Sequence, residues 1–205
     1  MTTLVEQFGN IDIYLFDQLL RGNIAPGMRV LDAGCGGGRN LVYLLREGYE
    51  IFGVDASAEA VEHLRSVAAR LAPGLDAGNF RVEPVEAMSF PDGFADVVIS
   101  NAVLHFARDD AQFEAMLGKM WRVLRPGGML FCRLASTIGV DPDQSFQPIA
   151  GRRFRMPGGM DWYLVDEALL MRLTTELGGE LIDPLKTTVV QGARCMTTWV
   201  VRKNR

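Results

Sequence analysis

Residues 30–40 read VLDAGCGGGRN, and this stretch decides the fold of the chain. It begins with apolar residues typical of a buried strand, and apolar residues at helical spacing follow it over positions 41–48. Between the two, Gly34, Gly36 and Gly38 let the backbone turn tightly and come close to a ligand. The stretch therefore predicts a strand, a ligand-binding loop and a helix.

An acidic residue, Asp32, stands directly before the glycines. A strand, glycine loop and helix also occur in dinucleotide-binding folds, where the helix N-terminus receives a pyrophosphate. A carboxylate beside the loop opposes a pyrophosphate, whereas it can hold a cationic amino group, directly or through water, and suit a positive sulfonium. The charge therefore favours a cationic ligand over a dinucleotide. A glycine-rich turn without a ligand is the remaining alternative.

Strands and helices alternate on both sides of this stretch. Apolar runs predict strands at 28–31, 49–54, 79–82, 94–100 and 129–134. Capping residues and helical spacing predict helices at 41–48, 57–71 and 109–125, the last with Arg122 and Arg125 in its final turn. This alternation implies βαβ units, hence a parallel sheet with helices on both faces.

The C-terminal part departs from this rhythm. Residues 135–160 show no regular pattern and are too long for an ordinary connection, so they predict a cover over the substrate. A helix at 166–177 and strands at 180–183, 187–190 and 195–202, with a turn at Gly192, follow. The expected fold is an α/β, Rossmann-like three-layer sandwich whose mostly parallel seven-stranded sheet ends in an antiparallel C-terminal hairpin.

The length of 205 residues predicts a single domain. Its expected parts are an N-terminal helical cover (1–27), a ligand-binding core (28–134), a substrate cover (135–163) and a terminal helix with strands (164–205).

Composition limits the compartment and the partners. With 48% hydrophobic and 22% charged residues, no apolar stretch of membrane-spanning length and no basic start to the N-terminus, we expect a soluble, cytoplasmic protein. Cys35, Cys132 and Cys195 form no Cys-x-x-Cys pair, which predicts reduced thiols and no metal site. A net charge of −4 argues against a nucleic-acid partner unless a local basic patch holds it.

Four motifs carry a resemblance to a known family. The spacing Asp32-x-Gly34-x-Gly36-x-Gly38 resembles motif I of class I S-adenosylmethionine-dependent methyltransferases. Asp55 comes 17 positions after Gly38, where the family has a second acid. FADVVISN at 94–101 is similar to the family's fourth-strand motif, and LRPGGML at 124–130 to the turn before its fifth strand. The chain is thus identified as a member of this family, which implies S-adenosylmethionine as cofactor.

The resemblance also implies roles for individual residues. Asp55 would accept hydrogen bonds from the ribose hydroxyls, with a helix-capping acid before Ser57 as the alternative. Pro84 stands where relatives carry an adenine-binding Asp, so the Val85 or Glu86 backbone, or the Glu86 carboxylate, would take its place; otherwise Glu86 is an exposed loop acid. The expected cofactor contacts are Asp32, Gly34, Cys35, Gly36, Gly38, Asp55, Ala56, Val85, Glu86 and Asn101, the last toward the amino acid moiety.

The acceptor side offers fewer signals. His105 is the candidate catalytic base because its pKa lies near neutrality, against the alternative of a packed histidine, and His63 is expected on the surface. No proline follows Asn101 and no Pro-Cys pair is present, which argues against DNA bases. Arg153 and Trp162 are candidates for binding an anionic substrate; a solvated basic turn is the alternative.

The chain also resembles the tellurite-resistance subgroup of small methyltransferases, through Gly38-Arg39-Asn40 and the tyrosines that follow. The predicted function is therefore methyl transfer from S-adenosylmethionine to a small-molecule acceptor by in-line displacement. The alternatives are an RNA or protein methyltransferase and a non-catalytic S-adenosylmethionine-binding partner subunit.

Overall fold

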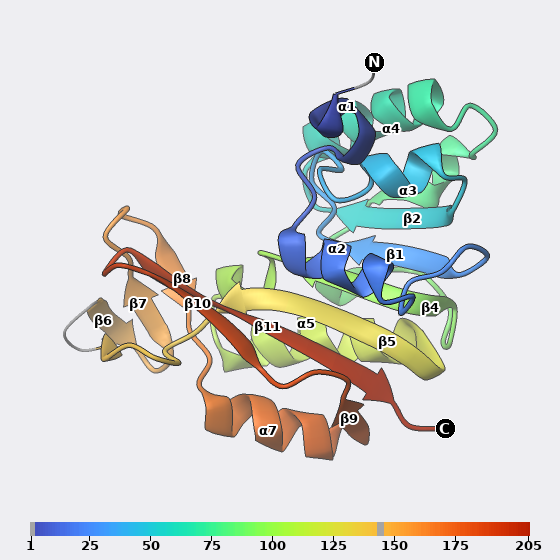
Figure 1. The fold of residues 1–205 in the computed structure, drawn as a ribbon. Coiled ribbons are helices and arrows are strands. Elements are labelled where there is room, and N and C mark those ends of the chain that lie inside the picture. Colours follow the sequence, from blue (N-terminus) through green and yellow to red (C-terminus); the bar gives the residue numbers. More distant parts are fainter. Residues whose placement is uncertain (1–2, 143–145) are drawn as a thin grey trace.

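The computed structural model describes residues 3–142 and 146–205, and its main sheet has eight strands (Figure 1). Five of them are β1 (Arg29–Ala33), β2 (Glu50–Asp55), β3 (Phe80–Val82), β4 (Ala95–Asn101) and β5 (Leu124–Ala135). These five pair in parallel in the order β3-β2-β1-β4-β5. The predicted mostly parallel sheet is confirmed.

The strand order reverses in the middle of this sheet. From β1 the chain moves outward to β2 and β3, and then returns to form β4 on the other side of β1. Ligands of open α/β sheets bind at such a reversal, outside the carboxyl ends of the strands. Gly34 follows β1 and Ala102 follows β4, so both residues lie at this point.

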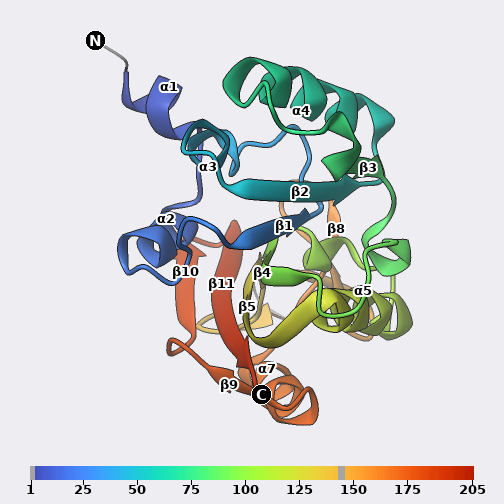
Figure 2. The same ribbon diagram turned by 90° about the vertical axis from the view of Figure 1, so that its right-hand side faces the viewer.

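Helices cover both faces of the sheet (Figure 2). On one face lie α2 (Ile13–Leu20), α3 (Val42–Arg46) and α4 (Ala58–Leu71), and on the other α5 (Asp110–Val123) and α7 (Glu167–Glu176). Val30 packs into the first core and its neighbour Leu31 into the second, as the two-residue period of a strand requires. The predicted three layers are confirmed. No helix in the described part of the chain is long and apolar enough to cross a membrane.

Three antiparallel strands complete the sheet. β11 (Arg194–Lys203) pairs with β5, and β10 (Lys186–Val190) pairs with β11 through the predicted hairpin. The short strand β9 (Gly179–Leu181) also pairs with β11, which adds an eighth strand to the seven expected. Trp199 of β11 is fully buried and donates a hydrogen bond from Nε1 to Thr174 Oγ1 at 3.0 Å, which fixes α7 on the sheet.

The helix predicted to run to Arg125 ends earlier. α5 stops at Val123, and Leu124 already has extended backbone angles and begins β5. A residue before a proline is restricted to extended conformations, and Pro126 imposes that on Arg125. Arg125 therefore does not oppose the dipole of α5, and its guanidinium pairs with Asp96 instead.

The segment expected to be an irregular cover contains a separate sheet. Its strands β6 (Gln147–Ala150), β7 (Arg153–Arg155) and β8 (Asp161–Tyr163) are antiparallel. Figure 1 shows this small sheet beyond the carboxyl ends of the parallel strands. A small core of Phe146, Met156 and Leu164 packs with Met196 of β11 and joins the small sheet to the main one. Positions 143–145 of the predicted cover lie outside the described residues.

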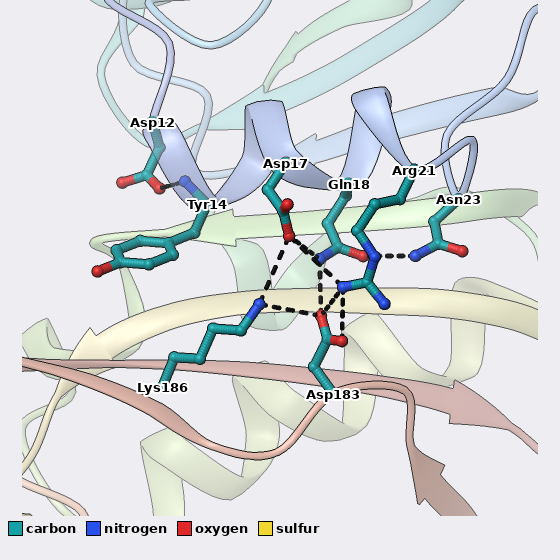
Figure 3. A network of polar contacts seen from close by, with 8 residues as sticks. All are labelled: Asp12, Tyr14, Asp17, Gln18, Arg21, Asn23, Asp183 and Lys186. Carbon is teal, nitrogen blue, oxygen red and sulfur yellow. Dashed lines mark hydrogen bonds and ion pairs between the residues drawn. The ribbon is translucent and has the colours of Figure 1, made fainter.

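The N-terminal region forms two helices, α1 (Leu4–Phe8) and α2. Figure 3 shows the polar network that fixes α2 to the chain before β10. Arg21 Nη1 lies 2.6 and 2.7 Å from the two carboxylate oxygens of Asp183, and Gln18 Nε2 donates to the same carboxylate at 2.8 Å. Lys186 Nζ lies 3.5 Å from Asp17 and adds a further contact. α2 is thereby joined to the C-terminal strands.

Candidate functional site

A cavity of about 440 Å³ opens at the reversal of the strand order. The ends of β1, β2 and β4, together with the short helices η2 (Val85–Ala87) and η3 (Leu104–Phe106) and the helix α5, supply its walls. Its lining residues are Gly34, Asp55, Ala56, Pro84, Val85, Glu86, Ala102, Val103, Phe106, Gln112 and Met116. Five of the predicted cofactor contacts are among them.

The glycine loop is held in place by the second strand. Gly34 and Cys35 donate backbone hydrogen bonds to the carbonyl of Val54, at 2.8 and 2.9 Å. Gly34 has φ +87°, and a Cβ there would lie 2.4 Å from Val103 Cγ2. Only glycine fits this position, since the conformation and the close approach both exclude a side chain. Gly38 is constrained in the same way, by Leu64.

Asp55 joins the loop to the start of α4. Its Oδ2 accepts a hydrogen bond from the backbone of Gly36 at 2.8 Å, and its Oδ1 accepts one from the backbone of Ser57 at 2.9 Å. Ser57, not Asp55, is the N-cap of α4. The half-buried Asp55 carboxylate is therefore fixed at the rim of the first cavity.

Asp32 is buried behind the loop, with 1% of its surface exposed. Its Oδ1 has no hydrogen-bond partner in the structure. Burial raises the pKa of the Asp32 carboxyl to about 7, an effect that the cationic Arg39 opposes and that Asp55 reinforces. A buried acceptor without a partner is costly, so this carboxylate is suited to a cationic hydrogen-bond donor.

The segment with the unexpected Pro84 also borders the first cavity. Val85 is buried, while Glu86 is half-buried and its Oε1 accepts a hydrogen bond from Gln112 Nε2 at 2.8 Å. Glu86 is thus held against α5 and not free in solution. All three residues from Pro84 to Glu86 line the cavity.

A second cavity, of about 310 Å³, adjoins the first. It is lined by Arg39, Asn101, Ala102, His105, Phe106, Arg133, Trp162, Arg194 and Met196. Ala102 and Phe106 line both cavities. Ala102 has φ +63°, a left-handed conformation that costs a non-glycine residue about 1–2 kcal/mol. Backbone strain of this kind gathers at functional sites.

Polar side chains at the ends of β4 and β5 face this second cavity. Arg39 Nη2 donates to Asn101 Oδ1 at 2.7 Å, and Asn101 is paired in register with Arg133 of β5. Arg133 Nη1 donates to Asp12 Oδ2 at 2.6 Å, and the Asp12 backbone donates to Asn40 Oδ1 at 3.0 Å. The N-terminal region, the glycine loop and β5 thus meet here.

His105 lines the second cavity but is itself 2% exposed. Its ring centroid lies 4.6 Å from that of Trp162 and 4.5 Å from that of Phe106. Burial lowers the pKa of His105 to about 4, so the imidazole is neutral near pH 7. Its Nδ1 has no partner. His63 is exposed, as expected.

The arginines of the small sheet are paired within it or with α7. Arg152 contacts Asp166, the N-cap of α7, at 2.8 Å, and Arg153 and Arg155 contact Asp161 at 3.4 and 2.7 Å. Arg153 lines neither cavity, whereas Trp162 lines the second. Of the two predicted substrate contacts, Trp162 lies at one of these two cavities and Arg153 does not.

Sequence reasoning missed several lining residues. Gln112 and Met116 belong to an amphipathic helix whose apolar face gave no sign of a ligand. Arg133 carried a usable signal, because the carboxyl ends of the parallel strands β4 and β5 meet beside the glycine loop. All three cysteines are free and buried, and no metal-binding cluster occurs among the described residues.

This geometry agrees with a sequence comparison. Residues 31–132, from β1 to β5, match a family described as a methyltransferase domain. The matched residues contain all four motifs quoted from the sequence, so the match to a methyltransferase domain agrees with the resemblance to class I S-adenosylmethionine-dependent methyltransferases.

The chain aligns with only part of each curated relative. The chain is 34% identical over 116 residues to an uncharacterized methyltransferase of Synechocystis sp., covering 56% of this chain and 51% of that protein. It is 31% identical over 105 residues to a ubiquinone biosynthesis O-methyltransferase of Chelativorans sp., covering 51% and 39%. The chain thus spans about half or less of the length of these two relatives. An S-adenosylmethionine-dependent methyltransferase structure from Methanosarcina mazei shares the fold, with a TM-score of 0.74, 23% identity and coverage of 91% and 97%.

Proposed function

We propose that the protein transfers a methyl group from S-adenosylmethionine to a small-molecule acceptor. The observation that carries this proposal is the Asp55 carboxylate, fixed by the Gly36 amide at the rim of a cavity that meets a second one at Ala102 and Phe106. Two adjoining cavities at a strand reversal suit a donor and an acceptor held side by side.

The first cavity suits the adenosine part of the cofactor. Asp55 would accept hydrogen bonds from the ribose hydroxyls, and Val85 with Glu86 would meet the adenine ring. The backbone around Gly34 and the buried side chains of Asp32 and Asn101 would hold the amino acid moiety. Asp32 Oδ1 and Asn101 Nδ2 are both buried and without partners, so they fit an ammonium group and a carboxylate respectively. The bound cofactor would supply a sulfonium methyl group. An acceptor lone pair would form a bond to the methyl carbon in line with the breaking carbon–sulfur bond, whose electrons would return to sulfur and release S-adenosylhomocysteine.

The second cavity suits the acceptor. We assign His105 and Trp162 to its wall, where the neutral His105 imidazole can orient an acceptor or take a proton from a group that is already acidic. The cavity is of the size that holds one small molecule. A relative named as a ubiquinone biosynthesis O-methyltransferase supports a small acceptor.

We also propose that the protein is a single domain and lies in the cytoplasm. Its three free, buried thiols suit a reducing environment. Cell fractionation with an antibody against the chain tests this, and recovery in the membrane or secreted fraction would contradict it.

The experiment follows the release of S-adenosylhomocysteine from S-adenosylmethionine with panels of phenols, carboxylic acids and thiols, with total RNA and with unmethylated protein. We expect turnover with a small molecule. Asp55→Ala should lower kcat/KM by about 100-fold, the effect of losing two hydrogen bonds to a charged group.

Asp76→Ala is the matched control, because Asp76 Oδ1 also accepts a hydrogen bond from the backbone two residues on, at Gly78, but Asp76 lines neither of the two cavities. Its activity should match the wild type. Turnover with RNA or with protein, but with none of the small molecules, would contradict the proposal of a small-molecule acceptor. Cofactor binding without any turnover would favour a partner subunit.

A further inference from the structure

The second cavity carries an excess of positive charge. Three arginines, Arg39, Arg133 and Arg194, line it, and no acidic residue does. They come from the glycine loop, from β5 and from β11, so three separate parts of the chain bring cations to one small space. Like charges gathered in a cavity repel one another, and an anionic ligand relieves that repulsion.

Only one of these arginines has an ion pair among the described residues, although Arg39 also interacts electrostatically with the buried Asp32. Arg133 is paired with the buried Asp12 carboxylate. The hydrogen-bond partner of Arg39 is the uncharged amide of Asn101. Arg194 is exposed, and its side chain has no hydrogen bond or ion pair with any residue that the structure describes. One arginine can serve the carboxylate of the cofactor, so at least one cation remains for the acceptor.

Most of the buried polar atoms that lack a hydrogen-bond partner around this cavity are donors. Asn101 Nδ2, Arg133 Nε and Trp162 Nε1 are buried and have no hydrogen-bond partner. Each of these atoms is a donor only. Three lining residues with unpaired donors are suited to oxygen atoms supplied by a ligand, since buried polar groups in native proteins are almost always paired.

One wall of the cavity is aromatic. The rings of Phe106, His105 and Trp162 follow one another with centroids 4.5 and 4.6 Å apart. Phe106 is 54% exposed although it is large and apolar, and it stands where the two cavities meet. A flat ring of a ligand would cover this exposed surface.

We propose that the methyl acceptor is a ring-bearing carboxylate, held by Arg194 at the open side of the second cavity with its ring against Trp162 and Phe106. This rests on the proposed function, because it assigns the acceptor of the same site. A carboxylate matches the planar fork of a guanidinium and the unpaired donors Arg133 Nε and Trp162 Nε1, while Asn101 Nδ2 is left for the carboxylate of the cofactor.

The test compares benzoate with its neutral analogue benzamide, titrated into the full chain with and without saturating S-adenosylhomocysteine. We expect benzoate to bind at least about tenfold more tightly than benzamide, the effect of one charge-assisted hydrogen bond. Arg194→Gln should remove this preference and leave the affinity for S-adenosylhomocysteine unchanged. Arg194→Lys should retain part of it, because the charge remains.

Arg70→Gln is the matched control, since Arg70 is an exposed arginine of α4 that lines neither cavity. It should behave as the wild type. The proposal is wrong if benzamide binds as well as benzoate, if benzoate does not bind at millimolar concentration, or if Arg194→Gln weakens S-adenosylhomocysteine instead. Failure of the wild type to bind S-adenosylhomocysteine would refute the proposed function. The preference for benzoate over benzamide is measured without S-adenosylhomocysteine as well, so the two proposals can fail separately.

Discussion

The Asp12 carboxylate and the Arg133 guanidinium form an ion pair of 2.6 Å that joins the N-terminal region to the carboxyl end of β5. Asp12 is also the N-cap of α2, where its Oδ1 accepts a hydrogen bond from the backbone of Tyr14. Figure 3 shows Asp12 at the start of α2, with its hydrogen bond from the backbone of Tyr14, and the network around Asp183 farther along the same helix. One buried side chain thus starts a helix and positions an arginine of the second cavity.

Removing the Asp12 carboxylate should destabilise the fold strongly. Asp12→Ala leaves the Arg133 charge unpaired and removes a helix cap, so we expect the free energy of unfolding to fall by about 3 kcal/mol or more. Urea denaturation measures this. Glu176→Ala, which breaks the exposed pair of Arg172 with Glu176, should cost less than about 0.5 kcal/mol. An equal decrease in the free energy of unfolding of the two variants would show that the buried Asp12 pair stabilises the fold no more than an exposed pair.

The close approach at Gly34 predicts a difference between two glycine substitutions. Gly22 and Gly34 both have positive φ, but a Cβ at Gly22 meets nothing within 4 Å. Gly22→Ala should therefore lower the free energy of unfolding by only about 1 kcal/mol, the cost of a left-handed conformation for alanine. Gly34→Ala adds a clash with Val103 and should abolish S-adenosylhomocysteine binding. Calorimetric titration and thermal unfolding of the two proteins check this, and a Gly34→Ala variant with normal binding would refute the geometry of the loop.

Cofactor binding should be linked to the ionisation of Asp32, whose pKa burial raises to about 7. An ammonium group near this carboxyl lowers its pKa, so binding should release a proton below pH 7 and the affinity should rise as the pH increases through that value. Titrations in buffers with different ionisation enthalpies measure the released protons. Asp32→Asn should bind more weakly and without this proton release. The same proton release from Asp32→Asn would exclude Asp32 as its source.

His105 should make the fold sensitive to acid. Its folded-state pKa of about 4 lies below the ordinary 6.5, so its contribution to stability is present above pH 6.5 and is lost as the pH falls toward 4. Between about pH 7 and about pH 5 the wild type should lose about 2 kcal/mol more than His105→Phe. Urea denaturation at each pH tests this, with His63→Gln as the exposed control. A parallel decline of wild type and His105→Phe would show that folding does not lower the pKa of His105.

Local patterns predicted the core of the fold. The apolar run of β1 and the helical spacing of apolar residues in α4 follow from burial against the neighbouring layers, so they are visible in the sequence. The glycines of the loop were predictable because their backbone angles and close contacts exclude other residues.

The small sheet and the second cavity depend on contacts between distant parts of the chain. β7 and β8 are only three residues long, and they contain charged residues that pair with each other, such as Arg155 and Asp161. Such short strands have no pattern of apolar residues by which a sequence would reveal them. Arg39, Arg133 and Arg194 are far apart in sequence, and only the pairing of β5 with β4 and β11 brings them to one cavity. The residues of the glycine loop were therefore predictable from their motif, whereas the three arginines of the second cavity were not.

The most direct test of the central claim is a calorimetric titration of the wild-type chain with S-adenosylhomocysteine and, separately, with NAD. The fixed Asp55 carboxylate and the buried Asp32 favour a ribose beside a cationic amino acid and disfavour a pyrophosphate. We predict saturable binding of S-adenosylhomocysteine at one site and no binding of NAD. Binding of NAD without binding of S-adenosylhomocysteine would contradict the account.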